Sequence, residues 1–196
     1  YSLNQACLKD AVVIFDGGCT GEVISKDGLL LTNHHCGYDQ IQQHSSLENN
    51  YLKDGFWAKS RAEELPNPDL SVQFLVEIKE YTSELLWQLP RGLSLKEEQT
   101  VLAEMVDSLE YHISDSLNLE ASIEKFYEGN QYYLFLYKVY TDIRLVGAPP
   151  EGIGNFGADT DNWVWPRHTG DFSIFRIYAD AKGEPADYSS SNIPYT

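Results

Sequence analysis

Cys19 and Cys36 bracket a segment that the sequence predicts to be a β-hairpin, and this pair constrains the fold more than any other feature. The run GEVIS, residues 21–25, precedes the turn KDG, and the apolar run LLLTN, residues 29–33, follows it. Two such runs joined by a tight Asp-Gly turn are typical of a hairpin. A disulfide between the two cysteines would enclose both strands and stabilise the hairpin by about 3 kcal/mol in the chain-entropy treatment.

The second strand ends in TNHHC, with two imidazoles and a thiol in a row. Three kinds of site compete for this stretch. Zinc sites commonly pair ligands two to four residues apart, whereas His34, His35 and Cys36 are adjacent and the other histidines are scattered. A Cys36 nucleophile beside its own base is also disfavoured, because nucleophile and base usually come from different parts of a chain. A general base at His35, held in place by the disulfide, fits best and implies an oxidising compartment.

A histidine base needs a carboxylate that accepts its Nδ1 proton and fixes its tautomer. Asp171, in the stretch RHTGDFSIF, is the candidate, because it follows Gly170 and opens a predicted strand of apolar and aromatic residues. An aspartate that only binds backbone at the start of a strand would look the same. The residues alone therefore leave both interpretations open.

Composition narrows the class of protein. The chain has 196 residues, 42% of them hydrophobic and 13% aromatic, which is typical of a folded globular protein. A formal charge of −16 disfavours nucleic acid as a partner, because phosphate backbones repel such a surface. The sequence contains no run of about 18 apolar residues, so no membrane span is predicted. The start, YSLNQACLKD, has no basic or apolar region typical of a secretory signal.

Outside the hairpin, the sequence alternates between strand and helix patterns. Short apolar or alternating runs predict further strands at residues 11–15, 71–78, 130–148 (as one bent strand or two) and 170–180. Two segments rich in Pro and Gly, residues 65–70 and 148–162, are predicted to be loops. The pattern favours an antiparallel β-barrel.

The middle of the chain is predicted to be helical from Ser94 to about Tyr127, with a break at residues 114–118. Ser94 followed by Glu97 resembles a capping box. The expected organisation is a first barrel segment, a helical insertion and the remainder of the barrel, with bounds at 1–82, 83–129 and 130–196.

Four stretches together resemble the bacterial dipeptidyl-peptidase 7/11 family: GGCTG, TNHHC, YLKDGF and DTDNWVWPRHTGDFSIFRIYAD. The block NWVWPRHTGD is long and unusual, and the resemblance covers nearly the whole chain. Members are serine exopeptidases with a chymotrypsin-like double β-barrel and an inserted helical domain. The resemblance therefore implies a mainly β fold, in which this chain forms the first antiparallel barrel with an inserted α-helical segment.

The resemblance also assigns roles. It implies that His35 is the general base, that Asp171 orients it, and that Asn162 and Trp163 hold the free α-amino group of a peptide with Arg167 in support. The chemistry agrees, since an amide carbonyl accepts from an ammonium and Trp is the strongest cation–π partner. Trp165, by contrast, is expected in the core.

The same resemblance implies peptide substrates with a free N-terminus, no metal or other cofactor, and a homodimer for the intact enzyme. It implies a periplasmic, secreted or cell-surface location in a Gram-negative bacterium. In one respect the chain departs from the family, because no glycine-flanked serine turn occurs in its 196 residues.

We therefore expect an N-terminal portion of a serine dipeptidyl peptidase, inactive alone, with the nucleophile, the second barrel and the main helical domain elsewhere. A catalytically silent peptide-binding barrel and a metal-dependent hydrolase are the alternatives.

Overall fold

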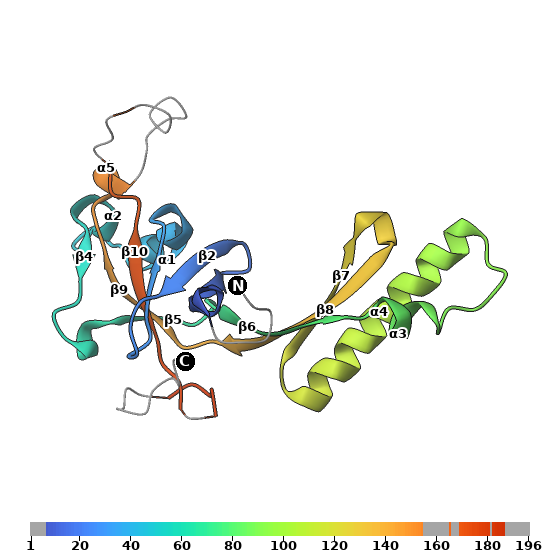
Figure 1. Cartoon of the computed structure of the whole chain (residues 1–196). Helices are drawn as coiled ribbons and strands as arrows, with labels where there is room; N and C mark the ends of the chain where they lie inside the picture. Colours follow the sequence, from blue (N-terminus) through green and yellow to red (C-terminus); the bar gives the residue numbers. More distant parts are fainter. Residues whose placement is uncertain (1–6, 155–164, 166–168, 181, 187–196) are drawn as a thin grey trace. The chain divides into compact units, whose positions relative to one another are not determined.

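The structure is a computed structural model that describes residues 7–154, 165, 169–180 and 182–186. The chain divides into two compact units, which are described separately (Figure 1). The sheet unit comprises residues 8–73 and 140–196, and the helix unit comprises residues 1–7 and 74–139. No described helix is both long and apolar enough to cross a membrane.

The sheet unit is built from short antiparallel strands. They are β1 (Val12–Phe15), β2 (Cys19–Val23), β3 (Leu29–Thr32), β4 (Phe56–Trp57), β5 (Leu65–Asn67), β9 (Ile143–Ala148), β10 (Ser173–Ile177) and the start of β6 (Val72–Glu80). Hydrogen bonding orders them β4-β9-β10-β3-β2-β1-β6, and β5 pairs with β9. Its helices are η1 (Leu8–Ala11), η2 (His35–Gly37), α1 (Tyr38–Gln43), α2 (Tyr51–Asp54), η3 (Arg61–Glu63) and α5 (Glu151–Gly154).

Alternation along these strands places apolar side chains in one core, as expected for half-buried strands. Phe15 of β1 and Phe175 of β10 are fully buried, and their ring centroids lie 4.9 Å apart. Fully or nearly fully buried around them are Val13, Val23, Leu30, Ile143, Leu145 and Ile177. The strand β10 that follows Asp171 is therefore anchored in the core.

The predicted hairpin is confirmed by the pairing of β2 with β3, in which Gly21 faces Thr32 and Val23 faces Leu30. In the turn, the Ser25 hydroxyl accepts the backbone N–H groups of Asp27 and Leu29. The hairpin thus delivers the end of β3 to the stretch that carries both imidazoles.

A buried charged network joins β10 to the segment before β5. Glu64 is 6% exposed, and its carboxylate accepts the Nε–H of Arg176 at 3.0 and 3.1 Å. The Tyr178 hydroxyl donates to the same carboxylate at 2.5 Å, and the guanidinium of Arg144 lies 3.9 Å from the centroid of the Tyr178 ring. Burial and the adjacent carboxylate raise the pKa of Tyr178 to about 12.

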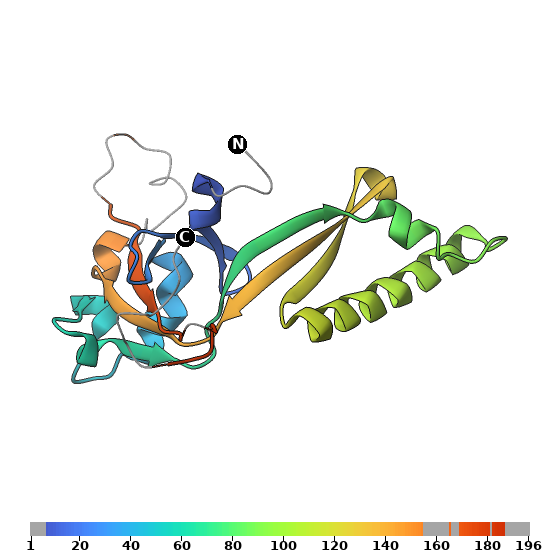
Figure 2. The same cartoon turned by 60° about the horizontal axis from the view of Figure 1, so that its bottom comes forward.

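The helix unit packs one long helix on a hairpin. It contains α3 (Thr82–Leu86), α4 (Leu95–Leu117), β7 (Glu120–Phe126), η4 (Tyr127–Gly129) and β8 (Gln131–Tyr140). Figure 2 shows α4 lying along the β7–β8 hairpin. The buried side chains Ala121, Ile123, Tyr132, Leu134 and Leu136 face the apolar stripe of α4, formed by Leu102, Met105, Val106, Leu109 and Ile113.

The predicted capping box begins α4. The Ser94 hydroxyl accepts the backbone N–H of Glu97, and the Glu97 carboxylate accepts the backbone N–H of Ser94 at 2.9 Å. Two of the free donors at the helix start are thereby satisfied.

The prediction of helix through Tyr127 was wrong. A single helix ends at Leu117, and its C-cap residue Asn118 adopts the left-handed conformation that terminates helices. The residues after it form β7, because Ala121 and Ile123 alternate toward the core and pair with β8. The helical pattern predicted for residues 120–126 is therefore overridden by their pairing with β8 in the folded structure.

Two predicted loops also contain regular structure. Leu65–Asn67 forms β5, in which Pro66 faces Arg144 of β9, a position that proline can take because β5 pairs on one side only. The start of the second predicted loop forms α5, and residues 155–162 lie outside the described part. The segment 130–148 forms two strands, β8 and β9, rather than one.

Candidate active site

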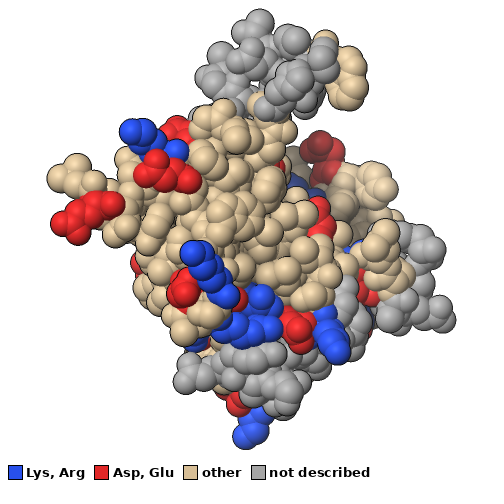
Figure 3. Space-filling model, turned by 90° about the vertical axis from the view of Figure 1, so that its left-hand side faces the viewer, with Lys and Arg blue, Asp and Glu red and all other residues tan. Residues whose placement is uncertain are grey.

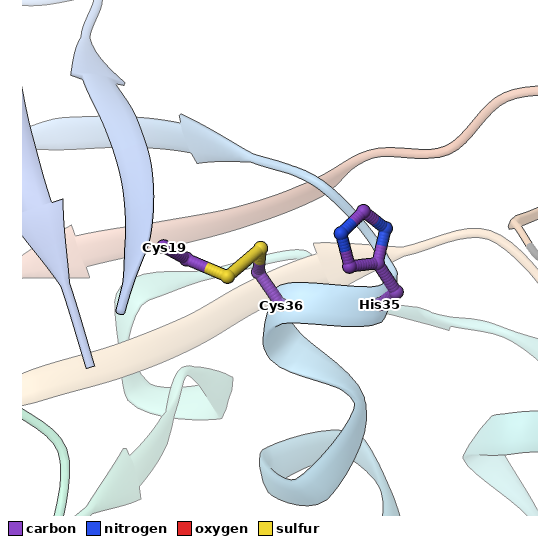
Figure 4. A group of neighbouring side chains, drawn as sticks. All are labelled: Cys19, His35 and Cys36. Carbon is purple, nitrogen blue, oxygen red and sulfur yellow. A yellow bond between two sulfur atoms is a disulfide. The ribbon is translucent and has the colours of Figure 1, made fainter. Parts of the chain in front are cut away.

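The turn η2 carries His35 directly after the hairpin. Cys19 and Cys36 form a disulfide whose Cα atoms are 6.1 Å apart, so the turn is bonded to the start of β2. Gly37 lets the turn approach β10 closely, because a Cβ there would lie 2.7 Å from the Ser173 hydroxyl. The disulfide and the glycine together fix the backbone on which His35 stands. Figure 4 shows the disulfide next to the imidazole.

Asp171 receives backbone donors from the same turn. Its Oδ1 accepts the N–H of His34 at 2.7 Å and that of His35 at 3.2 Å. The carboxylate side chain is 8% exposed. A buried carboxylate held by two backbone donors has little freedom to turn away from the imidazole.

The structure brings His35 and Asp171 together. Nδ1 of His35 lies 2.8 Å from Oδ2 of Asp171, although the two residues are 136 positions apart in sequence. A carboxylate at this distance places the ring proton on Nδ1 and leaves Nε2 as an acceptor. The imidazole is 66% exposed, so Nε2 can accept a proton from an incoming group.

Asn33 also belongs to this arrangement, although no motif or spacing in the sequence singles it out. Its side-chain amide donates to Oδ2 and to the backbone carbonyl of Asp171, both at 3.2 Å. The Ser173 hydroxyl donates to the carbonyl of Asn33 at 2.8 Å, and Ser173 is fully buried. Ser173 therefore supports the pair and is not exposed as a nucleophile.

His34 lies on the buried side of the turn. It is 0% exposed, and neither ring nitrogen has a hydrogen-bond partner of good geometry among the described residues. The ring packs edge-on against Tyr38 and directly on Gly154, where an added Cβ would lie 2.4 Å from two ring atoms. A buried polar ring without partners is costly, so its packing has to be tight.

Burial lowers the pKa of His34 below its usual value and keeps the ring neutral. The backbone of Pro149 and the charges of Asp171 and Glu151 oppose that effect, and His35 adds to it. The two adjacent histidines thus differ in their surroundings. The His35 ring is exposed and oriented by Asp171, whereas the His34 ring is buried and neutral.

The sequence profile of the Peptidase S46 family matches residues 1–196. The chain belongs to the peptidase S46 family. This assignment confirms the resemblance to the dipeptidyl-peptidase 7/11 group that the TNHHC and NWVWPRHTGD stretches indicated.

Curated relatives match throughout this chain but are far longer. The Asp/Glu-specific dipeptidyl-peptidase of Capnocytophaga gingivalis is 54% identical over 199 residues, covering 100% of this chain and 27% of that protein. Dipeptidyl-peptidase 7 of Phocaeicola vulgatus is 55% identical over 201 residues, covering 99% of this chain and 28% of that protein. The chain thus spans less than a third of the length of these relatives.

A solved structure has the same fold. The crystal structure of Porphyromonas endodontalis DPP11 in complex with substrate has a TM-score of 0.81 and 52% identity, covering 100% of this chain and 29% of that one. This match confirms the expected mainly β, antiparallel fold with a helical segment.

Asn162, Trp163 and Arg167, the three residues expected to hold a peptide amino group in this S46 chain, lie outside the described residues. Trp165 is described and is 85% exposed, so its expected place in the core was wrong. Core packing was expected because it is the usual role of a tryptophan side chain, but no apolar surface covers Trp165 among the described residues.

The surface beside Asp171 is apolar. The next residue, Phe172, contacts Trp57 of β4 with ring centroids 6.1 Å apart, and Trp57 remains 52% exposed. The Trp57 ring covers Gly147, where a Cβ would lie 2.5 Å from it. In Figure 3 much of the face that carries β4 and α2 is free of charged side chains.

Three potential metal ligands also meet at this site. Ligand atoms of Cys19, His35 and Cys36 all lie within 4.8 Å of one another (Figure 4). In the disulfide the two sulfur atoms are bonded to each other, whereas a cysteine binds zinc only as a free thiolate. The oxidised site therefore does not fit a metal ion through these ligands.

Proposed function

We propose that the full-length protein containing this chain is a serine-type dipeptidyl peptidase, a hydrolase that removes dipeptides from the free N-terminus of peptides. The observation that carries the proposal is the contact of 2.8 Å between Nδ1 of His35 and Oδ2 of Asp171. The proposal is also supported by the relatives, which are named as dipeptidyl peptidases.

His35 would act as general base and Asp171 as its orienting carboxylate. Nε2 of His35 takes the proton of a serine hydroxyl while the serine oxygen attacks the carbonyl of the second peptide residue. The imidazolium that forms is stabilised by Asp171, and it then returns the proton to the leaving amine. Water attacks the acyl-enzyme in the same way and releases the dipeptide.

The serine would come from another part of the full-length polypeptide, as would the second barrel and the main helical domain. The coverage of the relatives, 27–28% of their length, supports this division. Within this chain we propose bounds at 1–82, 83–129 and 130–196 for the first barrel segment, the helical insertion and the barrel remainder.

Asn162 and Trp163, supported by Arg167, would hold the α-amino group of the substrate. The relatives include enzymes named Asp/Glu-specific and dipeptidyl-peptidase 7 at 54% and 55% identity. This chain is therefore about equally similar to both kinds, and the preferred side chain would be set elsewhere. The disulfide supports a periplasmic, secreted or cell-surface location. A homodimer is proposed for the intact enzyme.

The full-length protein, assayed with a chromogenic dipeptidyl substrate, tests the proposal. Turnover should require a free amino group, disappear when that group is acetylated, and persist after chelator treatment. His35→Ala should lower kcat by about 10⁴-fold or more, whereas His112→Ala on α4 should leave it unchanged. Binding of the peptide without turnover would indicate a silent peptide-binding barrel instead, and loss of activity on chelation would indicate a metal-dependent hydrolase.

A further inference from the structure

A second chemistry is available at the base of the hairpin. The disulfide bonds Cys19 to Cys36 at 2.04 Å, and His35 is the neighbour of one of them. The three side chains come from two segments that the sequence separates but the fold joins, the start of β2 and the turn η2. We propose that reduction of this disulfide creates a zinc site whose ligands are Cys19, Cys36 and His35.

The ligand types suit zinc. His35 and Cys36 are adjacent in sequence, closer than the usual two to four residues, but the fold adds Cys19 of β2, and the three ligand atoms lie within 4.8 Å of one another. Two thiolates and one imidazole are three ligands of the types that zinc prefers, and a water completes the tetrahedron. Two thiolates also neutralise the charge of the ion. Zinc sites with three protein ligands and one water are a recurring arrangement.

The spacing suits zinc after small movements. Bond lengths of about 2.3 Å to sulfur and 2.0 Å to nitrogen place tetrahedral ligand atoms about 3.5–3.8 Å apart. The ligand atoms now lie within 4.8 Å of one another, with the sulfurs at the bonding distance of 2.04 Å. Each sulfur would move by about 1 Å once the bond is broken. The His35 side chain is 66% exposed, so little packing opposes its adjustment.

The remaining nitrogen of the imidazole is already oriented. Nδ1 of His35 is engaged by Asp171, which leaves Nε2 for a metal. Figure 4 shows one edge of the ring turned toward the disulfide. Carboxylate, imidazole and zinc in series recur in zinc proteins, because the carboxylate fixes the tautomer and raises the basicity of the ligand.

The reaction balances with a dithiol as reductant. The dithiol gives two electrons and two protons to the disulfide and becomes a disulfide itself, and two thiols form on the protein. Each thiol loses its proton when its sulfur binds Zn²⁺. A small-molecule disulfide reverses the sequence: it accepts two electrons and two protons and becomes two thiols, the bond between Cys19 and Cys36 re-forms, and Zn²⁺ is released.

The consequence for activity rests on the proposed function. A His35 nitrogen that binds zinc cannot accept a serine proton, so zinc would inhibit the reduced enzyme and not the oxidised one. Before its disulfide forms, the enzyme would thus be held inactive by zinc through its own base.

Cobalt is the probe that tests the site without reference to activity. The full-length protein, reduced and freed of reductant, should bind one additional Co²⁺ per chain relative to its oxidised form. It should show thiolate-to-cobalt charge-transfer absorption and the d–d bands of tetrahedral cobalt, both lost when Zn²⁺ is added. Cys19→Ser and Cys36→Ser should each weaken binding more than tenfold, and Asp171→Asn by about 10–100-fold.

Cys7→Ser is the matched control and should leave the cobalt spectrum unchanged. An identical spectrum for Cys19→Ser and the parent protein would overturn the inference, as would loss of the spectrum in Cys7→Ser. Near-UV circular dichroism should show that the reduced protein keeps its native signal with zinc present; a reduced protein that stays unfolded with zinc would also overturn it. If the oxidised enzyme has no peptidase activity but the cobalt spectrum appears, the proposed function fails and the metal site stands.

Discussion

The backbone N–H of His34 donates a hydrogen bond of 2.7 Å to Oδ1 of Asp171. The residue before the proposed base thus holds the carboxylate that orients the base. With Oδ1 occupied by backbone, Oδ2 is the oxygen left to receive Nδ1 of His35, and it lies 2.8 Å away. One turn therefore supplies both the imidazole and the donors that aim its partner.

Asp171→Asn should lower kcat of the full-length enzyme by about 10⁴-fold, because the amide would favour the wrong tautomer of His35. KM should change little, since the carboxylate does not contact substrate. Steady-state kinetics measure both constants. Asp180→Asn, at an exposed turn, should leave kcat unchanged. An Asp171→Asn enzyme within tenfold of the parent would remove the orienting role.

His34 should make stability depend on pH in mild acid. Its pKa is lowered in the folded state, so below about pH 6.5 the unfolded chain binds a proton that the folded chain does not. Stability should be complete above that pH and fall on acidification, by at most about 1.4 kcal/mol per pH unit. Asp171 and Glu151 raise the pKa of His34, and His35 lowers it further, so these neighbours modulate the midpoint.

Urea midpoints measured between about pH 5 and 8 test this expectation. His34→Leu should flatten the dependence, whereas His112→Gln on the exposed part of α4 should retain it. Parallel pH curves for the parent and His34→Leu would show that His34 titrates normally.

The disulfide should contribute about 3 kcal/mol to the free energy of unfolding, because it closes a loop with a sequence separation of 17. Cys19→Ser with Cys36→Ser should lower the denaturation midpoint accordingly, and the reduced, zinc-free parent protein should match the double variant. Cys7→Ser lies outside this bond and serves as the control. A double variant as stable as the oxidised parent would mean that the hairpin needs no covalent link.

Glu64→Ala should cost about 3–5 kcal/mol, because it leaves the buried guanidinium of Arg176 without its carboxylate. Denaturant unfolding measures the loss. Glu84→Ala removes the exposed ion pair with Lys79 and should leave the midpoint nearly unchanged. Equal effects of the two substitutions would contradict the distinction between buried and exposed pairs.

Ser94→Ala should destabilise α4 by about 1 kcal/mol, because it removes the hydroxyl that accepts the N–H of Glu97. Hydrogen exchange of the amides in the first turns of α4 should accelerate about fivefold. Ser116→Ala, near the other end of the helix, should not change exchange in those turns. Unchanged exchange in Ser94→Ala would show that packing alone begins the helix.

Local sequence patterns correctly predicted the elements that are determined by residues close together in the sequence. The hairpin, the capping box and the strand β10 follow from turn residues, spacing and alternation within a few residues. The candidate base and its carboxylate could be named from sequence, but the donors that hold Asp171 could not. Asn33 meets Asp171 only because β3 and β10 are neighbours in the sheet.

The features that the sequence did not predict depend on pairing between residues far apart in the chain. Residues 120–126 became a strand because β8 lies beside them, and the sequence EASIEKF alone has no strong strand signal. Glu64 gives no local indication of burial, since its partners Arg176 and Tyr178 are more than 100 positions away.

The helix unit leaves the sheet on β6 and returns on β8, and these two strands are neighbours. A segment whose entrance and exit lie side by side can be lengthened, shortened or exchanged without rethreading β3 and β10, the strands next to His35 and Asp171. Residues 74–139 therefore have the layout of an interchangeable cassette, which can change in length or sequence while the contact between His35 and Asp171 is kept.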